Sequence, residues 1–542
     1  MLSSLTDSNS DSRAPRTLKI GEVMYRIPSR ICDVVEPWAR LSPDSPALVE
    51  ATGTWTYGQL DVVTRETQTW LRGLGIRPGD RVMIVGENCR AFVAILLAAA
   101  SLDAWPVLVN ARLSAREVDE IRDHCGARRV LYTTGISAHA SDHAARHGAT
   151  VGVHHGLPGA IGVGPLNATV EPERISEDIT NRVAAVIYTS GTTGLPKGVM
   201  LTHRNLLFMA AGSVRVRAVT SKDRVYGVLP MSHAVGLAVV LLGTLLAGSS
   251  VYLTWRFDPM SARVILEKDG LTLLYGTPAI FNQWLQYAKL RKVSSLKFPA
   301  LRVITSSGAP LDPVTKSGTE SLFGMVLHNG YGITECSPTI SLTRPEAPRT
   351  DISVGSVFPG VEIRLIGSDR QPVPAGEIGE LHVRGPNIMK GYYRAPEETA
   401  AVIDTDGWFN THDLARLENG SLFIVGRTKD LIVRRGFNVY PAEVEAVLNG
   451  HPAVVCCAVI GRAIKGDEEV IAFVQLLLDV SLTPSDLADY SAQHLAAYKR
   501  PSQILIVSAM PTTPTGKIAK AELKKVAENQ FGGHATIPAT CS

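Results

Sequence analysis

The sequence contains few cysteines, and none of them is arranged to bind a metal or to build a disulfide framework. Its 542 residues include seven cysteines, without a CxxC pair or a Cys/His cluster that has the spacing of a zinc site. An odd number of scattered cysteines is typical of a reducing compartment. We therefore expect a cytoplasmic protein without a structural zinc site.

An excess of charge of one sign and long hydrophobic runs are also absent. The formal net charge is only +3 and no long basic run occurs, so nothing indicates a nucleic-acid partner. The most apolar stretch, Ala234–Ala247, is shorter than the ~20 residues that span a bilayer. We interpret it as a buried helix that leads into a strand, and we predict no transmembrane segment.

Two common nucleotide-binding motifs are missing. The chain has no Walker A sequence, GxxxxGK(S/T), and no GxGxxG motif that follows a strand. These absences count against a P-loop nucleotidase and against a dinucleotide-dependent enzyme.

The hydrophobic content of 45% is sufficient for several domains. Up to about residue 340, short β-branched runs alternate with helix-like segments, which is the pattern of parallel sheets covered by helices. Shorter strands separated by Gly, Pro and Asp turns follow. We predict an α/β fold with a large N-terminal domain of doubly wound sheets plus a small β-barrel-like subdomain, followed by a small mobile α+β C-terminal domain. The expected parts are a flexible tail at 1–25, the large domain at 26–428, the C-terminal domain at 429–531 and a flexible tail at 532–542.

The segment Tyr188–Gly198 reads YTSGTTGLPKG and directly follows the predicted strand Val183–Ile187. Glycines let backbone N–H groups approach an anion closely, hydroxyls add hydrogen bonds to phosphate oxygens, and a lysine supplies a cation. An ordinary surface turn is the alternative, but it rarely combines all three residue types in one short stretch. The candidate phosphate contacts are Thr189, Ser190, Gly191, Thr192, Thr193, Gly194 and Lys197.

This segment resembles the signature loop of the adenylate-forming superfamily, which comprises acyl-CoA synthetases, adenylation domains of peptide synthetases and luciferases. Further matches follow in the same order from about residue 30 to about residue 530. The resemblance implies that ATP, with Mg²⁺, converts a carboxylic acid into its acyl-adenylate. Coenzyme A would then accept the acyl group.

A second match, Asn329–Glu335, reads NGYGITE and implies a nucleotide site. The resemblance implies that Tyr331 packs on adenine, that Thr334 contacts the α-phosphate and that Glu335 holds Mg²⁺. Mg²⁺ is a cation that prefers carboxylate oxygens. A polar loop after a strand is the alternative. The remaining candidate contacts of the nucleotide are Gly332 in this segment, and Gly308 and Ala309 in the turn Ser306–Leu311.

The segment Gly407–Ala415, GWFNTHDLA, resembles the ribose-binding part of the family. Asp413 matches the carboxylate that binds the ribose hydroxyls, and Arg427 matches a second ribose contact. This sequence departs from the pattern at His412, where glycine is usual. Either the imidazole fits beside the ribose site or the backbone avoids positive φ there.

The C-terminal region supplies the other half of the implied site. Lys429 falls at the hinge between the two domains, and Gly436 borders the path of the pantetheine arm of coenzyme A. Arg435 would meet coenzyme A phosphates, or else belong to a solvated charged turn. Lys517, behind a Pro/Thr/Gly loop, matches the lysine that bridges the substrate carboxylate and the α-phosphate. The predicted catalytic residues are therefore Lys517, Lys197 and Glu335.

The segment Leu229–Leu237, LPMSHAVGL, bears on the identity of the acid. It has no aspartate that would bind the amine of an amino acid. His233 matches a side chain that flanks the acyl pocket in the ligases, although a core histidine is the alternative. The expected lining is small and apolar, which favours a fatty or simple aromatic monocarboxylic acid. It consists of Val235, Gly236, Gly308, Gly330, Ile333 and Pro338.

We therefore predict an ATP-dependent, AMP-forming acyl-CoA synthetase, with a role in fatty acid or lipid metabolism. One alternative is an acyl-AMP ligase that loads a carrier protein. The other is an inactive nucleotide-binding protein, which the presence of all the matched charged residues disfavours.

Overall fold

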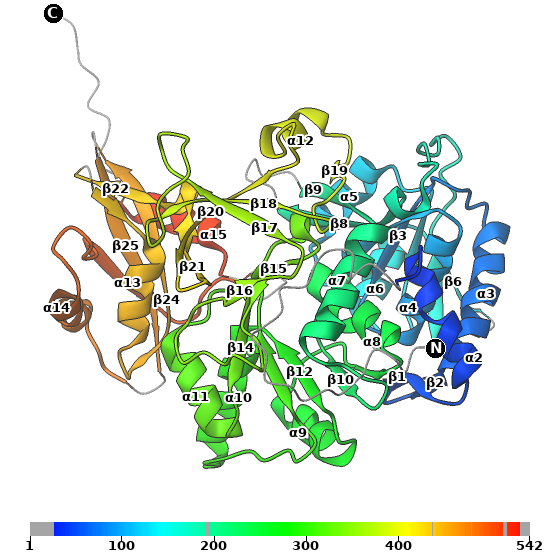
Figure 1. Ribbon diagram of the computed structural model, residues 1–542, viewed down its shortest axis with the longest axis horizontal. Helices are drawn as coiled ribbons and strands as arrows, with labels where there is room; N and C mark the ends of the chain where they lie inside the picture. Colours follow the sequence, from blue (N-terminus) through cyan, green and yellow to red (C-terminus); the bar gives the residue numbers. More distant parts are fainter. Residues whose placement is uncertain are drawn as a thin grey trace, which may run out of the picture.

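The computed structural model describes residues 27–154, 156–190, 196–435, 437–464, 467–477, 480–512 and 518–531. The fold contains two large mixed sheets, whose strands interleave along the chain, a small antiparallel sheet and a C-terminal α+β unit (Figure 1). The predicted α/β class, with a smaller α+β unit at the C-terminal end, is confirmed.

The first large sheet has parallel central strands and antiparallel edges. In spatial order it contains β19 (Gly391–Tyr392), β9 (Pro196–Thr202), β8 (Val183–Ser190), β4 (Trp105–Asn110), β3 (Arg81–Gly86), β5 (Arg129–Tyr132), β7 (Ala160–Val163) and β6 (Thr150–Val153). Strands β8, β4, β3 and β5 are parallel, and β9 pairs antiparallel with both β8 and β19.

The second large sheet has the same design. In spatial order it contains β16 (Ser356–Val357), β15 (Thr339–Leu342), β14 (Leu327–Gly332), β13 (Val303–Ser306), β12 (Leu273–Gly276), β10 (Arg224–Gly227), β11 (Ser250–Leu253), β1 (Pro46–Glu50) and β2 (Gly53–Thr56). Strands β14, β13, β12, β10, β11 and β1 are parallel. The predicted loops therefore follow the carboxyl ends of β8, β13 and β14, where ligands of such sheets gather.

Helices cover both large sheets. They are α2 (Glu36–Leu41), α3 (Tyr57–Gly73), α4 (Arg90–Ser101), α5 (Ala115–Cys125), α6 (Ala138–Arg146), α7 (His203–Val216), α9 (Pro259–Lys268), α10 (Pro278–Arg291), α11 (Pro313–Phe323) and α12 (Pro396–Val402). Capping boxes at Thr56, Ser114 and Thr202 begin α3, α5 and α7. Helices α3 and α4 share one hydrophobic core with the second sheet, whereas α5 and α6 pack on the opposite face of the first sheet.

The apolar run Ala234–Ala247 forms a buried helix that leads into β11, as predicted. It begins as a π-helix, η4 (Val235–Leu242), and continues as α8 (Gly243–Leu246). A run that is apolar on every side has no periodic face, so its sequence does not indicate the π-helical form. In the described part of the chain, no helix is long and apolar enough to cross a membrane.

The predicted antiparallel subdomain is a four-stranded sheet. Its strands are β17 (Glu362–Ile366), β18 (Gly379–Arg384), β20 (Phe409–Glu418) and β21 (Ser421–Arg427), in this order. Among the described residues this order is that of an open sheet, so the subdomain is not a closed barrel.

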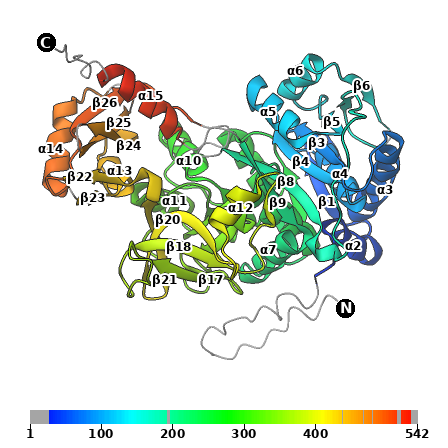
Figure 2. The same cartoon turned by 90° about the horizontal axis from the view of Figure 1, so that it is seen from above.

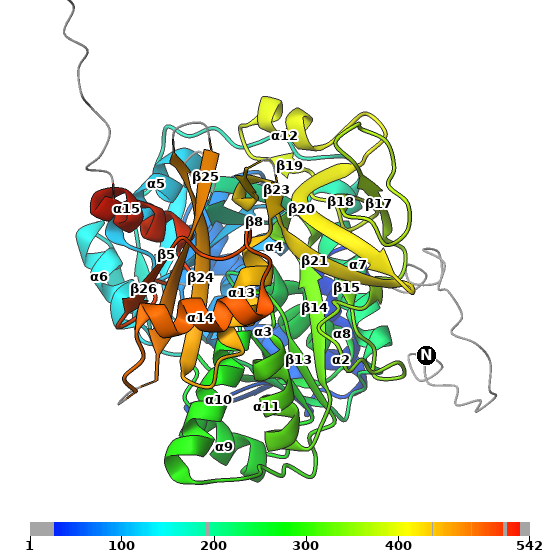
Figure 3. The same cartoon turned by 90° about the vertical axis from the view of Figure 1, so that its left-hand side faces the viewer.

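The C-terminal unit is a sheet with a core on each face. It contains the hairpin β22 (Ile432–Arg434) and β23 (Phe437–Val439), the sheet β24 (Val454–Ile464), β25 (Asp467–Leu476) and β26 (Gln503–Val507), and the helices α13 (Pro441–Asn449), α14 (Pro484–His494) and α15 (Lys520–Phe531). Helices α13 and α14 pack on one face of the sheet and α15 on the other (Figure 3). Figure 2 shows this unit at one end of the molecule and α3, α5 and α6 at the other.

Candidate active site

The candidate phosphate loop connects the two strands of a hairpin. Thr189 on β8 pairs with Lys197 on β9, and Ser190 pairs with Pro196. Thr189 is half-buried at the carboxyl end of β8. The predicted contacts Gly191, Thr192, Thr193 and Gly194 lie outside the described residues, as does the side chain of Ser190.

Lys197 is held by two side chains from a later part of the chain. Its ammonium group forms an ion pair with the Glu398 carboxylate on α12 and lies 5.1 Å from the ring centroid of Tyr392. The Lys197 side chain is only 21% exposed. The cation is thus oriented at the end of the loop that contains the candidate phosphate contacts.

Glu335 lies on a short 3₁₀ turn, η5 (Thr334–Cys336), after β14. Its Oε1 accepts a hydrogen bond of 3.0 Å from the Tyr392 hydroxyl, and its carbonyl oxygen accepts one of 2.8 Å from the Met389 amide. In the described part of the chain, no group of three or more His, Cys, Asp or Glu side chains could hold a metal ion. A single carboxylate fits Mg²⁺, which is usually bound through one or two carboxylates and the phosphates of its nucleotide.

Two predicted nucleotide contacts, Tyr331 and Arg427, converge on the carboxylate of a third, Asp413. Asp413 is 3% exposed, its Oδ2 accepts a hydrogen bond from the Tyr331 hydroxyl, and its Oδ1 accepts one of 2.9 Å from Arg427 Nε. Asp413 on β20 and Arg427 on β21 are direct cross-strand partners. Burial and the Asp413 carboxylate raise the pKa of Tyr331 well above its usual value, so the phenol remains a donor.

His412, at the position where glycine is usual in the related pattern, has a left-handed backbone conformation. Its φ is +56°, which excludes the alternative in which the backbone avoids positive φ. Histidine is among the residues that tolerate this region best. The imidazole faces Glu380 on β18, with 3.2 Å between Nδ1 and Oε1, and Thr428 donates a hydrogen bond of 3.0 Å to the same oxygen. The side chain therefore contacts the neighbouring strand, while Asp413 keeps its own partners.

The two glycines of the candidate adenine site, Gly308 and Gly332, differ in the space available for a side chain. Gly308 has φ +85°, and a Cβ there would meet no atom closer than 3.8 Å. A Cβ on Gly332 would lie 1.8 Å from the Pro338 carbonyl oxygen, so glycine is required at this position. Ala309 follows Gly308 and is half-buried, and Thr334 is 6% exposed.

The predicted acyl-site residues lie on two elements. His233 belongs to the turn before η4 and donates its amide to the Pro230 carbonyl oxygen at 3.0 Å. Val235 is the first residue of η4, and a Cβ on the next residue, Gly236, would lie 2.0 Å from that same Pro230 oxygen. Gly236 is thus required by close backbone packing, independently of any ligand.

Two further members of the predicted acyl lining, Gly330 and Ile333, lie at the end of β14 and just beyond it. The nearest atoms to a Cβ on Gly330 are 3.7 Å away, an ordinary contact distance. Gly330 is therefore the position of the set where a larger side chain fits.

The C-terminal candidates are partly described. Lys429 lies in a 3₁₀ turn, η6 (Thr428–Asp430), between β21 and β22. Arg435, with φ +51°, forms the turn between β22 and β23, is exposed, and donates its amide to Asp467 Oδ1 at 2.6 Å. Gly436 and Lys517 lie outside the described residues.

Comparisons with known proteins identify the family of this chain. A sequence model of the AMP-binding enzyme family matches residues 35–393, and a model of the AMP-binding enzyme C-terminal domain matches residues 443–517. The chain belongs to the AMP-binding enzyme family.

Feruloyl-CoA synthase of Amycolatopsis sp is 35% identical to this AMP-binding enzyme over 491 residues, which cover 90% of this chain and 97% of that protein. For 4-coumarate–CoA ligase 5 of Oryza sativa subsp. japonica the identity is 32% over 499 residues, with 89% and 91% covered. The structure of o-succinylbenzoate CoA synthetase from Bacillus subtilis, solved with its acyl-adenylate intermediate, matches with a TM-score of 0.77 and 27% identity, over 91% of this chain and 97% of that chain.

This AMP-binding enzyme is an ATP-dependent acyl-CoA ligase, as predicted. It converts a small-molecule carboxylic acid into an acyl-adenylate with release of pyrophosphate, and then transfers the acyl group to coenzyme A. The enzyme uses ATP as its nucleotide and Mg²⁺ as its metal ion, and coenzyme A accepts the acyl group. These findings favour the ligase over the inactive protein and over the carrier-loading enzyme.

The AMP-binding enzyme has two site residues that the motifs do not reveal, Tyr392 and Glu398. Both belong to the segment that follows Lys390, GYYRAPEET, and both contact predicted catalytic residues. A paired tyrosine and an acidic cluster beside proline are the only signals in the sequence, and they are common in surface turns.

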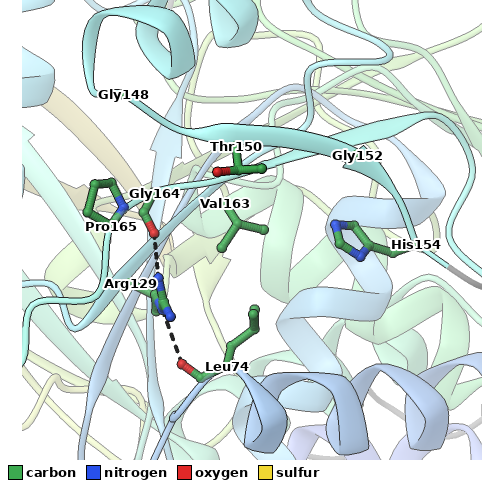
Figure 4. A pocket seen from close by; sticks show the side chains of 9 residues that line it. All are labelled: Leu74, Arg129, Gly148, Thr150, Gly152, His154, Val163, Gly164 and Pro165. Carbon is green, nitrogen blue, oxygen red and sulfur yellow. Dashed lines mark hydrogen bonds between the residues drawn. The ribbon is translucent and has the colours of Figure 1, made fainter.

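A cavity of about 320 Å³ lies away from these residues, beside β6, β7 and α3 (Figure 4). Its lining contains none of the predicted site residues. The Arg129 guanidinium there donates to the carbonyl oxygens of Leu74, at 3.1 Å, and Gly164, at 2.8 Å. The hydrogen bonds of the Arg129 guanidinium therefore join neighbouring backbone segments of the fold.

Proposed function

We propose that this ligase activates an aromatic monocarboxylic acid of the hydroxycinnamate class. The observation that carries the proposal is that the predicted acyl set is small and apolar, while the Lys197–Tyr392–Glu335 contacts and the Tyr331–Asp413–Arg427 contacts supply groups for ATP and Mg²⁺. Relatives that match nearly the whole chain include a feruloyl-CoA synthase and a 4-coumarate–CoA ligase. Both enzyme names contain a planar phenylpropenoic acid. Of the two predicted classes of acid, fatty and simple aromatic, they favour the aromatic class.

The nucleoside would bind on Tyr331 and Asp413. The Tyr331 ring would pack against adenine, and Asp413 with Arg427 would bind the ribose hydroxyls. An ionised carboxylate has about four lone-pair positions, so Asp413 has acceptor capacity beyond its two protein partners. Gly308, Ala309 and Gly332 would allow the adenine to approach the backbone, and Thr334 would contact the α-phosphate.

The triphosphate would extend from there toward Lys197. Thr189, Ser190, Gly191, Thr192, Thr193 and Gly194 would supply hydroxyl and amide donors. Glu335 would hold Mg²⁺, which when bound neutralises phosphate charge. Because a carboxylate that attacks the α-phosphorus brings two anions together, catalysis requires charge neutralisation and alignment above all.

Lys517 would complete the site from the C-terminal side, by bridging the acid carboxylate and the α-phosphate. A carboxylate oxygen of the acid forms a bond to the α-phosphorus of ATP. At the same time, the bond between the α-phosphorus and the pyrophosphate leaving group breaks. We propose that residues 429–531 then rotate about Lys429, which withdraws Lys517 and brings Gly436 and Arg435 toward coenzyme A. The thiolate attacks the acyl carbon and AMP leaves.

The acid would lie between the turn before η4 and the end of β14. His233, Val235, Gly236, Gly330 and Ile333 would surround it. Apolar walls favour an aromatic ring, and no member of this set except His233 has an ionisable side chain. The proposal also includes a cytoplasmic location, supported by the use of ATP and coenzyme A.

The test is acid-dependent pyrophosphate release across a panel of ferulate, 4-coumarate, benzoate, octanoate and phenylalanine, with and without coenzyme A. We expect the highest kcat/KM for a hydroxycinnamate, with thioester formed only when coenzyme A is present. A preference for octanoate would contradict the aromatic assignment. Adenylate that forms but is not transferred to coenzyme A would point to a carrier-protein thiol.

A variant of Gly330 tests the acyl pocket within the same panel. The Cβ of Gly330→Val has room, and we expect its branched side chain to lower kcat/KM for ferulate at least tenfold while acetate or propionate is activated as by the parent enzyme. The matched control is Gly73→Val at the end of α3, where a Cβ would meet nothing within 4 Å. Equal losses for small and aromatic acids would contradict the placement of Gly330 beside the acid.

A further inference from the structure

Tyr392 lies between the two charged residues that are proposed to act on the phosphates. Its strand, β19, pairs antiparallel with β9, and Tyr392 is the direct partner of Val199, two residues after Lys197. This pairing brings the phenol hydroxyl to Glu335 Oε1, at 3.0 Å, and the ring face to Lys197 Nζ, at 5.1 Å. Tyr392 is only 7% exposed.

The Tyr392 hydroxyl engages one of the two oxygens of Glu335. A carboxylate is an acceptor only, so Oε1 keeps one lone pair and Oε2 keeps both of its lone pairs for a cation. Among the described residues, no hydrogen bond to Glu335 Oε2 is formed. A hydrogen bond to one oxygen restricts the rotation of the carboxylate and so reduces the entropy that metal binding must overcome.

Lys197 does not depend on the phenol hydroxyl in the same way. Its ammonium is paired with Glu398 and faces the aromatic ring, and both of these contacts persist if only the hydroxyl is removed. The hydroxyl therefore acts on Glu335 alone.

We propose that Tyr392 is a positioning residue that orients Glu335 for Mg²⁺ bound with ATP. This inference rests on the proposed role of Glu335. Removing a side chain that hydrogen-bonds a metal ligand typically lowers metal affinity by about 10–100-fold. The expected consequence is a metal-binding defect in the Tyr392→Phe variant with intact nucleoside binding.

The adjacent residue supplies a matched control. Tyr393 is also buried, at 3% exposed, and its hydroxyl also donates to a carboxylate, Glu173 Oε1. Tyr393→Phe therefore removes a buried phenol hydroxyl from the same segment without affecting Glu335.

The experiment measures Mn²⁺ affinity of the full chain by electron paramagnetic resonance titration, in the presence of α,β-methylene-ATP. The analogue cannot be cleaved between the α- and β-phosphates, so binding is measured without turnover. We expect Tyr392→Phe to raise the Kd for Mn²⁺ about tenfold and Tyr393→Phe to leave it within twofold of the parent. In pyrophosphate assays with saturating ATP, Tyr392→Phe should need about tenfold more Mg²⁺ for half-maximal rate, with kcat largely retained at high Mg²⁺.

A comparison with a double variant shows whether Tyr392 affects Mn²⁺ binding through Glu335. If Tyr392 acts through Glu335, adding Tyr392→Phe to Glu335→Gln weakens Mn²⁺ binding no further. If Tyr392→Phe does not fold, Tyr392→Gln, which keeps a donor, should bind Mn²⁺ more tightly than Tyr392→Leu.

Three results would overturn the assignment or its basis. Equal Mn²⁺ affinities for Tyr392→Phe and Tyr393→Phe would make Tyr392 merely structural. A further loss in the double variant would place its effect elsewhere. If Glu335→Gln binds Mn²⁺ as the parent does, the proposed role of Glu335 fails, and this is distinguishable because the parent would still release pyrophosphate with an acid.

Discussion

The Tyr331 hydroxyl donates a hydrogen bond to the Asp413 carboxylate and so connects the second large sheet to the small antiparallel sheet. Asp413 is nearly fully buried, and a buried carboxylate is stable only when its oxygens are paired. Tyr331 and Arg427 satisfy one oxygen each. The proposed ribose contact is thus fixed in position before the nucleotide binds.

Removing the Tyr331 hydroxyl should weaken ATP binding. For Tyr331→Phe we expect the KM for ATP to rise about 10–100-fold, because a hydrogen bond to a charged group contributes about 1.5–3 kcal/mol. Steady-state kinetics with varied ATP measure this effect. The control is Tyr57→Phe, which removes a buried hydroxyl bonded to the Leu245 and Ser249 carbonyl oxygens. A comparable rise in the KM for ATP in both variants would show that the effect is one of general stability.

Replacing His412 with glycine should stabilise the protein without changing nucleotide affinity. A left-handed conformation costs an L-residue about 1–2 kcal/mol, and glycine has no such cost. The lost contact between the exposed imidazole and Glu380 offsets part of this gain, so we expect the free energy of unfolding to rise by about 0.5–1 kcal/mol. The KM for ATP should stay within twofold, because the imidazole faces Glu380 rather than Asp413.

His412→Ala provides the comparison for that prediction. Alanine lacks the imidazole but keeps a Cβ at φ +56°. Urea unfolding should therefore rank glycine above histidine, and alanine below both. Equal stability of the alanine and glycine variants would mean that the backbone at this position has no strain to relieve.

Lys517 should be required for one half-reaction only. We expect Lys517→Ala to lower acid-dependent pyrophosphate release by 10²-fold or more, because it removes the cation that is proposed to bridge the reacting anions. Thioester formation from supplied acyl-adenylate and coenzyme A should stay within a few-fold of the parent. Lys520→Ala is the control, since that ammonium pairs with Glu445 at 2.7 Å within the C-terminal unit. Equal loss in both half-reactions would contradict the assignment.

Local patterns in the sequence predict much of this fold. The sequence pattern indicates a helix at 441–449, a strand at 80–86 and a helix at 91–102, and the structure has α13 at Pro441–Asn449, β3 at Arg81–Gly86 and α4 at Arg90–Ser101. Each of these elements carries its own hydrophobic pattern and its own boundary residues, such as the proline that begins α13. The motifs likewise predict the residues of the candidate site, because each motif is a short stretch of consecutive residues.

Relations between distant segments are not visible in such patterns. Tyr392 reaches Glu335 and Lys197 only because β19 adds to the edge of the first sheet beside β9. The direction of the His412 imidazole likewise depends on the neighbouring strand, β18, which supplies Glu380. Strand pairing is set by the packing of the whole domain, and no short-range signal in the sequence specifies it.

A buried histidine outside the site should make the protein less stable in mild acid. His203 is fully buried at the start of α7, and its Nδ1 accepts a hydrogen bond of 3.1 Å from the Ile31 amide. Burial, together with the nearby Arg30 charge, lowers the pKa of His203 from 6.5 to about 4. The neutral form belongs to the folded state, so this stability is present above pH 6.5 and is lost as the pH falls toward 4.

The size of this loss can be measured through a variant. Between pH 7 and pH 5 the unfolded state gains a proton at this position that the folded state does not, which lowers the free energy of unfolding by about 2 kcal/mol. His203→Gln retains an acceptor for the Ile31 amide but does not titrate. We therefore expect its free energy of unfolding in urea to fall by about 2 kcal/mol less than that of the parent over this interval. The dependence should not vanish, because burial also lowers the pKa of His328 to about 4. Parallel curves for the parent and the variant would show that His203 takes up its proton equally in both states.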